Sequence, residues 1–265
     1  MKKYIYLIVL IVVNMHAIDA TMEIIKKNTS LPNVAINLYS YNMNKKFNNT
    51  KKILSQDLLV SGHFNTVNTE YITSIKNIPN YVTLEKDNID LYINIFIDKH
   101  DENGISVHAK LYDINSKTMI MDKLFNTTNK VRYPFIAHQI AITINKLFNA
   151  PSINWMDKFV VFAKYTGKQT SEIIIADYTL TYQKVIIKGG LNIFPKWSTS
   201  KQNSFYYTSY KNKIPTLMRQ NIYTGANDEI LQSEGMIVCS DVSEDGNKLL
   251  LTIAPNSQPD IYMYD

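Results

Sequence analysis

The sequence Ile173-Ile174-Ile175-Ala176-Asp177 decides the fold, because it recurs twice at a spacing of about 44 residues. The copies are Leu217-Met218-Arg219-Gln220-Asn221 and Ile261-Tyr262-Met263-Tyr264-Asp265. Between them lies a second repeated unit, Phe194-Pro195-Lys196-Trp197-Ser198, which corresponds to a polar turn at Ser240–Lys248. Repeats of this length are typical of β-propeller blades.

Each repeat predicts a small antiparallel sheet that cannot bury both of its faces alone. Such sheets become stable when neighbours stack around a common axis. We therefore expect residues 155–265 to form a partial all-β propeller, with two blades and part of a third. A ring of blades presents loops at the mouth of its central pore, which favours binding over chemistry.

The sequence before residue 150 has a different character, since helical and strand patterns alternate there. We expect a small two-layer α+β domain over residues 21–150, with a mixed sheet and two helices, joined to the propeller near 150–154. Thr50 is the expected cap of the first helix, and Gly62 its stop. The expected strands are 33–39, 90–97, 106–112 and 118–124, and the expected helices are 50–61 and 134–149.

Residues 1–20 have the pattern of a Sec-type signal peptide. Lys2 and Lys3 precede an apolar run of about ten residues, which is too short for a membrane span of about 20. Small residues follow, and we expect cleavage after Ala20, with Ala17 as the competing position. The sequence therefore predicts an exported protein that does not span the membrane.

Composition argues against several classes of function. The net charge of +5 is mild and dispersed, so nucleic acid is not an expected partner. Cys239 is the single cysteine, and its apolar neighbours predict a buried, inert thiol. No Gly-rich phosphate loop and no G-x-S-x-G motif occurs, so we expect neither a cofactor nor a catalytic residue.

Two polar groups invite a metal interpretation that the sequence does not support. Asp241, Ser243, Asp245 and Gly246 imitate the start of a calcium loop, but Thr252 stands where a bidentate glutamate is needed. The second group contains acidic residues and histidines. A hairpin explains it without a metal, because its members would be turn residues and one exposed strand residue. That group consists of Asp98, His100, Asp101 and His108.

Several motifs together resemble the TolB family. Ser61-Gly62-His63-Phe64-Asn65 resembles the exit of the family's first helix, and Ala176-Asp177-Tyr178 resembles its first blade. Phe194-Pro195-Lys196-Trp197-Ser198 and Val242–Gly246 resemble the repeated P-x-W-S-P-D-G turn. The resemblance extends from about Thr21 to Asp265, and its combination of domains is more specific than the blade motif alone.

The resemblance implies a non-enzymatic periplasmic scaffold of the Tol–Pal system, which maintains outer-membrane integrity and constriction during cell division. Its implied partners are the peptidoglycan-associated lipoprotein (Pal) and TolA, with other outer-membrane proteins as further candidates. Pal would bind loops at the pore mouth, here Leu191, Asn192, Ile193, Phe194, Glu234, Gly235, Met236 and Cys239. TolA would bind the segment after the signal, here Thr21, Met22, Glu23, Ile24, Ile25, Lys26 and Lys27. The other interpretation of that segment is an edge strand of the protein's own α+β domain.

The sequence also departs from the family pattern. Ser198-Thr199-Ser200-Lys201 lacks the Pro, Asp and Gly of the repeated turn, and Met236 stands where relatives can contribute a histidine. Family members have six blades, so we expect the chain to be a C-terminally truncated product or a partial sequence. Two functions of other classes stay open: a secreted propeller enzyme, such as a lactonase or glycan lyase, and a carbohydrate-binding propeller.

Overall fold

The computed structural model describes residues 30–40, 47, 49–68, 78–99, 103–211 and 213–265. These residues form two compact units. The first comprises the described residues up to 98, with 106–125 and 140–153, and the second comprises 99–105, 126–139 and 154–265. The first half of the long helix α4 (Tyr133–Leu147) thus clusters with the strands that follow it. The predicted division at 150–154 stays a prediction.

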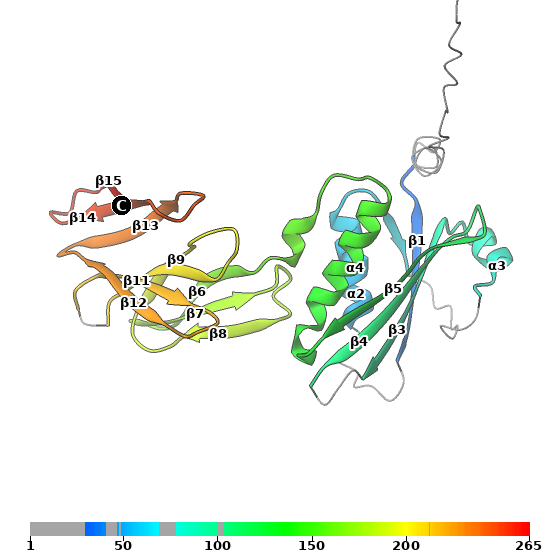
Figure 1. Ribbon diagram of the computed structural model, residues 1–265, viewed down its shortest axis with the longest axis horizontal. Helices are drawn as coiled ribbons and strands as arrows, with labels where there is room; N and C mark the ends of the chain where they lie inside the picture. Colours follow the sequence, from blue (N-terminus) through cyan, green and yellow to red (C-terminus); the bar gives the residue numbers. More distant parts are fainter. Residues whose placement is uncertain (1–29, 41–46, 48, 69–77, 100–102, 212) are drawn as a thin grey trace, which may run out of the picture. The chain divides into compact units, whose positions relative to one another are not determined.

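The first unit is built on a five-stranded sheet in the order β2-β1-β3-β4-β5. Strand β1 pairs in parallel with both β2 and β3, whereas the short connections from β3 to β5 suit antiparallel neighbours. Figure 1 shows α2 and α4 on one face of this sheet. The strands are β1 (Asn33–Ser40), β2 (Asn65–Val67), β3 (Leu91–Lys99), β4 (Ile105–Asp113) and β5 (Thr118–Thr127).

Helix α2 (Asn49–Val60) forms where its apolar spacing predicts it. Ile53, Leu54 and Leu58 are buried, and Gly62 follows with a φ of +74°, the left-handed conformation that ends many helices. Thr50 is not the cap that we expected, because it lies inside the first helical turn, where its buried Oγ1 has no hydrogen-bond partner.

A short helix that the sequence did not reveal, α3 (Tyr81–Lys86), covers part of the same unit. Asn80 caps it by accepting a hydrogen bond from the Thr83 amide at 3.2 Å. Leu84 of this helix packs in an apolar cluster with Ala35, Ile89, Tyr92, Tyr112 and Ile114. At six residues, α3 offers too little periodic pattern to be predicted.

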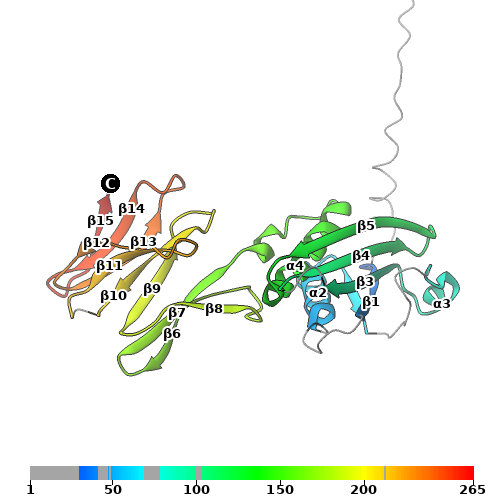
Figure 2. The same cartoon turned by 60° about the horizontal axis from the view of Figure 1, so that its bottom comes forward.

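The second unit contains three antiparallel sheets, which match the predicted repeats. Their orders are β6-β7-β8, β9-β10-β11-β12 and β13-β14-β15, and Figure 2 shows the last two from the side. The three copies of the opening repeat lie in β7 (Thr170–Ala176), β11 (Thr216–Asn221) and β15 (Asp260–Tyr264). The other strands are β6 (Val160–Gly167), β8 (Gln183–Ile187), β9 (Asn192–Trp197), β10 (Ser204–Ser209), β12 (Asn227–Gln232), β13 (Met236–Val242) and β14 (Leu249–Ala254).

Apolar clusters join successive sheets. Ile173 and Ile175 of β7 pack with Phe205 and Tyr207 of β10, whereas Tyr206, on the other face of β10, packs with the third sheet. The alternation of β10 residues between two clusters is what a strand with both faces buried requires. The described sheets do not close a ring, so the architecture is an α+β domain followed by a partial propeller, as predicted.

Candidate functional site

The two predicted docking loops, residues 191–194 and 233–239, each lie at the start of the first strand of a sheet. Leu191 precedes β9 and residues 192–194 belong to it, whereas residues 233–235 precede β13 and residues 236–239 belong to it. Strands β9 and β13 contact each other, and Lys196 of β9 forms an ion pair with Asp241 of β13, with Nζ and Oδ1 2.8 Å apart. A second link joins the sheets where the Thr208 hydroxyl donates to the Ile237 carbonyl at 2.5 Å. These contacts fix the two loops relative to each other.

Phe194 is the prominent exposed side chain of the first loop region, with 45% of its surface accessible. The ladder between β9 and β10 explains its position. Ile193 pairs with Thr208 and Lys196 with Tyr206, so β9 carries one extra residue there. This is a β-bulge, in which Phe194 adopts a φ of +55°. The bulge turns this aromatic side chain outward, next to the buried Ile193 and the half-buried Pro195.

Met236 is the exposed apolar side chain of the second loop, with 37% of its surface accessible. The preceding residue must be glycine, because a Cβ atom on Gly235 would lie 1.8 Å from the carbonyl oxygen of Ala254. That close approach holds Met236 opposite Ala254 in the β13–β14 ladder. Glu234 is also exposed, so the loop presents one charge beside one apolar group.

The remaining predicted residues of these loops point into the protein or lie at its boundary. Asn192, Ile193 and Cys239 are buried, and Leu191 and Gly235 are half-buried. Burial raises the pKa of the Cys239 thiol to about 11, so the sulfur is protonated at neutral pH. The exposed side chains of the predicted set are therefore Phe194, Glu234 and Met236. The predicted TolA-binding segment, Thr21–Lys27, lies outside the described residues.

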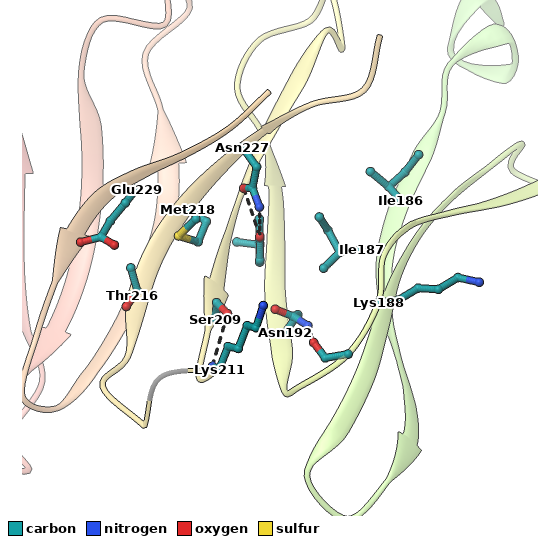
Figure 3. Close-up of a pocket in the computed structure, with 12 residues that line it drawn as sticks. Ile186, Ile187, Lys188, Asn192, Ser209, Lys211, Thr216, Met218, Asn227 and Glu229 are labelled. Atoms are coloured by element: carbon teal, nitrogen blue, oxygen red, sulfur yellow. Dashed lines mark hydrogen bonds between the residues drawn. The ribbon is translucent and has the colours of Figure 1, made fainter. Parts of the chain in front are cut away.

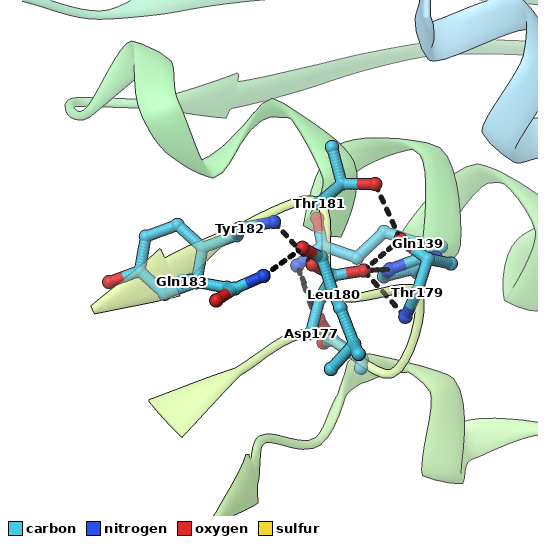
Figure 4. A network of polar contacts seen from close by, with 9 residues as sticks. Gln139, Asp177, Thr179, Leu180, Thr181, Tyr182 and Gln183 are labelled. Atoms are coloured by element: carbon cyan, nitrogen blue, oxygen red, sulfur yellow. Dashed lines mark hydrogen bonds and ion pairs between the residues drawn. The ribbon is translucent and has the colours of Figure 1, made fainter. Parts of the chain in front are cut away.

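A buried polar network organises the turn between β7 and β8 (Figure 4). Asp177 accepts hydrogen bonds from the amides of Tyr182 at 2.5 Å and Thr179 at 2.9 Å, and another from the Thr179 hydroxyl. His138 of α4 places its Nε2 atom 3.3 Å from Asp177, and both side chains are fully buried. Burial alone would raise the pKa of Asp177, but hydrogen bonds from His138, Thr179 and Tyr182 outweigh it and lower that pKa.

Aromatic side chains surround this network. Phe135 makes edge-on contacts with Phe159 and Tyr182, and the Arg132 guanidinium lies over the Phe135 ring at 4.9 Å. Burial raises the pKa of Asp157, although Gln139 donates a hydrogen bond to it. We interpret this region as a structural anchor for the first half of α4. The sequence placed His138 only beside an apolar stripe and contained no signal for its partner 39 residues away.

The groups that invited a metal interpretation have other contacts. His108 hydrogen-bonds with Asp122 across β4 and β5, whereas His100 and Asp101 lie outside the described residues. Asp245 accepts from the Ser243 hydroxyl at 2.6 Å and from the Asn247 amide at 3.1 Å, as expected of a polar turn. Within the described ranges, no three His, Cys, Asp or Glu side chains gather as a metal site would require. No helix in those ranges is long and apolar enough to cross a membrane.

Comparisons with known proteins give the context for this site. Residues 20–120 match the family model of the TolB amino-terminal domain. The chain is 44% identical to the Tol-Pal system protein TolB of Wolinella succinogenes, over 95% of this chain and 60% of that protein. It is 41% identical to the Tol-Pal system protein TolB of Helicobacter hepaticus, over 97% of this chain and 61% of that protein.

A solved structure supports the fold. The crystal structure of TolB from Acinetobacter baumannii superimposes with a TM-score of 0.70 at 23% identity, over 89% of this chain and 58% of that chain. At that identity the likeness concerns the fold alone. The chain spans about three fifths of the length of the curated relatives that it matches.

Proposed function

The chain belongs to the TolB family, and from that premise we propose that it acts as a non-enzymatic periplasmic scaffold of the Tol–Pal system. Its role is to link the peptidoglycan-associated lipoprotein to TolA and so to maintain outer-membrane integrity and constriction during division. The observation that carries the proposal is 44% identity to a Tol-Pal system protein over 95% of the chain. Residues 1–20 act as the export signal, with cleavage after Ala20.

Pal binds the exposed side chains of the two predicted loops at the start of β9 and β13. Phe194 and Met236 provide apolar surface, and Glu234 provides a charge at its margin. Because the β9 bulge and the Gly235 contact hold the backbone of these residues in place, binding does not have to order that backbone. Few interface residues carry most of a binding energy, and exposed aromatic side chains are frequent among them.

The test compares the binding of purified Pal, without its lipid, to three forms of the full chain. We expect the double variant Phe194→Ala/Met236→Ala to bind about thirtyfold more weakly or worse, which corresponds to the loss of roughly 2 kcal/mol or more. The matched control is Tyr223→Ala, which removes an exposed aromatic from the β11–β12 turn at the other end of the blade. Equal binding by all three forms would refute the assignment of the loops.

TolA binds the segment Thr21–Lys27 by adding it as a strand to a sheet edge, a mode that suits short extended peptides. Deleting this segment should abolish binding to TolA in a surface-plasmon assay while leaving binding to Pal intact. If the deletion leaves TolA binding unchanged, TolA uses another part of the chain.

A further inference from the structure

A cavity of about 440 Å³ lies between β8 and the second sheet of the same unit (Figure 3). Its volume falls within the range of small-molecule and short-peptide sites. It is distinct from the exposed Phe194 and Met236 surface, although Asn192 belongs to the first docking loop and also lines the cavity.

One wall of the cavity is apolar because of a second β-bulge. Ile173 pairs with Ile187 and the next residue, Ile174, pairs with Val185, so Ile186 is an extra residue in β8. Both Ile186 and Ile187 line the cavity, opposite Met218 of the second sheet. This wall suits the side chain of an apolar residue.

The same strand offers backbone groups to a ligand. Strand β8 is the edge of the sheet β6-β7-β8, and among the described strands it pairs only with β7. An edge strand presents unpaired N–H and C=O groups at the regular spacing of a strand, which an extended peptide matches with its own backbone. The edge therefore favours a peptide as the occupant.

Charged side chains lie at separate positions around the cavity. Lys188 and Lys211 both line it, and neither has an ion-pair partner among the described residues. Glu229 lines the cavity from β12 and likewise has no ion pair there. In Figure 3 the Lys188 side chain runs away from Lys211, so one ammonium group, that of Lys211, faces the cavity. With the Glu229 carboxylate it complements a ligand that carries a carboxylate at one end and a cationic group at the other.

A fixed amide lies between these charges. Asn192 is 2% exposed, and its Nδ2 donates to the carbonyls of Gly189 at 2.8 Å and Gly190 at 3.3 Å. Those bonds orient the side chain, while its Oδ1 accepts no hydrogen bond from the described residues. A pre-oriented acceptor in a cavity suits a peptide N–H.

We propose that this cavity is a binding site for a short peptide that has a free C-terminal carboxylate and a basic amino end. The carboxylate binds Lys211, a peptide N–H donates to Asn192 Oδ1, and the basic end meets Glu229. The middle of the peptide extends along the edge of β8, with an apolar side chain against Ile186, Ile187 and Met218. The site is independent of the proposed binding of Pal and TolA.

The test uses the full chain and three probes: the tripeptide Lys-Val-Ala, its C-terminal amide, and the disaccharide chitobiose. Binding is followed by NMR through the isoleucine methyl signals, including those of Ile186 and Ile187. We expect Lys-Val-Ala to bind with a Kd on the order of 0.1–1 mM and its amide to bind about tenfold more weakly. Chitobiose should leave the signals unchanged.

Charge-neutralising variants locate the contacts. Lys211→Gln should bind the acid and the amide alike, and Glu229→Gln should weaken both about equally. The matched control, Lys201→Gln, removes one exposed lysine that does not line the cavity and should bind as the parent chain does. The proposal is overturned if Lys-Val-Ala does not bind at about 10 mM, if acid and amide bind the parent chain equally, if the control loses as much affinity, or if chitobiose binds instead.

Discussion

Asp177 shows how one position of the repeat is adapted to its surroundings. Its counterpart one repeat later, Asn221, accepts from the amides of Tyr223 and Thr224 at 2.9 Å each, much as Asp177 accepts from Thr179 and Tyr182. Both residues thus cap the turn after the second or third strand of a blade. Only Asp177 also faces a buried histidine, so only there does the carboxylate have a role that an amide cannot fill.

Asp177→Asn tests the value of that charge. Asparagine can keep the turn bonds but loses the charge-assisted contact with His138, so we expect a loss of about 1.5–3 kcal/mol in the free energy of unfolding at pH 7. The lowered pKa of Asp177 contributes stability that is present above the unfolded-state pKa of about 3.9 and is lost as the pH falls through the folded-state value.

Urea unfolding at pH 7 and pH 3 measures the difference in the free energy of unfolding between the parent chain and Asp177→Asn. The gap between the parent chain and Asp177→Asn should shrink at pH 3, because the carboxylate of the unfolded parent chain, with a pKa of about 3.9, is then mostly protonated and unfolding takes up a proton. The control Asp228→Asn, an exposed position on β12, should change stability little at either pH. A gap that is the same at both pH values would mean that the charge is not what matters.

The Cys239 thiol should be unreactive toward thiol reagents in the folded chain. Its thiol is 3% exposed and its pKa is raised to about 11, so both access and thiolate fraction are low at pH 7.5. We expect no reaction with Ellman's reagent in buffer and reaction of one thiol after unfolding in guanidinium chloride. Rapid labelling of the native protein would show that the third sheet opens readily.

At the scale of elements, the sheets are joined by a few buried polar bonds as well as by apolar clusters. The hydroxyl of Thr208 is fully buried in β10 and donates to the carbonyl of Ile237 in β13. Because Ile237 follows Met236 directly in β13, this bond helps to place the backbone at Met236. A bond of this kind between neighbouring blades couples their positions more tightly than apolar packing alone.

Thr208→Val removes the bond with little change of volume. The Ile237 carbonyl loses its donor in a buried setting, so we expect a cost of about 1–3 kcal/mol in the free energy of unfolding. Thr252→Val is the matched control, since its hydroxyl contacts the exposed Ser240 and should contribute less than about 1 kcal/mol. Chemical denaturation followed by tryptophan fluorescence compares the two, and an equal cost would contradict the role assigned to Thr208.

At the scale of the whole molecule, the two compact units have separate cores. Leu54 lies in the core of the first unit, and Leu217 lies in the cluster that joins the second and third sheets of the second unit. Truncating a fully buried leucine to alanine costs about 2–5 kcal/mol. We expect the two losses to add to within about 0.5 kcal/mol, because the residues share no cluster.

Calorimetry of Leu54→Ala, Leu217→Ala and the double variant tests this independence. Each single variant should lower the midpoint of one unfolding component and leave the other near its parent value. If either substitution lowers both components together, the units unfold as one cooperative body.

The sequence predicted the strands of the second unit well because strand patterning is local. Alternating residues such as those of β10 and the repeat of about 44 residues reflect burial on successive faces, which each segment carries in its own composition. The same holds for α2 and α4, whose apolar residues recur at helical spacing. Short elements such as α3 and β2 were not predicted, because they contain too few residues to show a period.

By itself, then, the sequence determined the order and type of the long elements and the family resemblance, and from that resemblance it predicted where the candidate docking loops lie along the chain. Tertiary structure alone decided which loop residues are exposed, through the bulge at Phe194 and the close approach at Gly235. It also decided the His138–Asp177 pair and the cavity beside β8. The physical reason is that periodicity is a property of neighbours in the chain, whereas bulges, buried pairs and cavities arise where packing brings together residues that no local pattern connects.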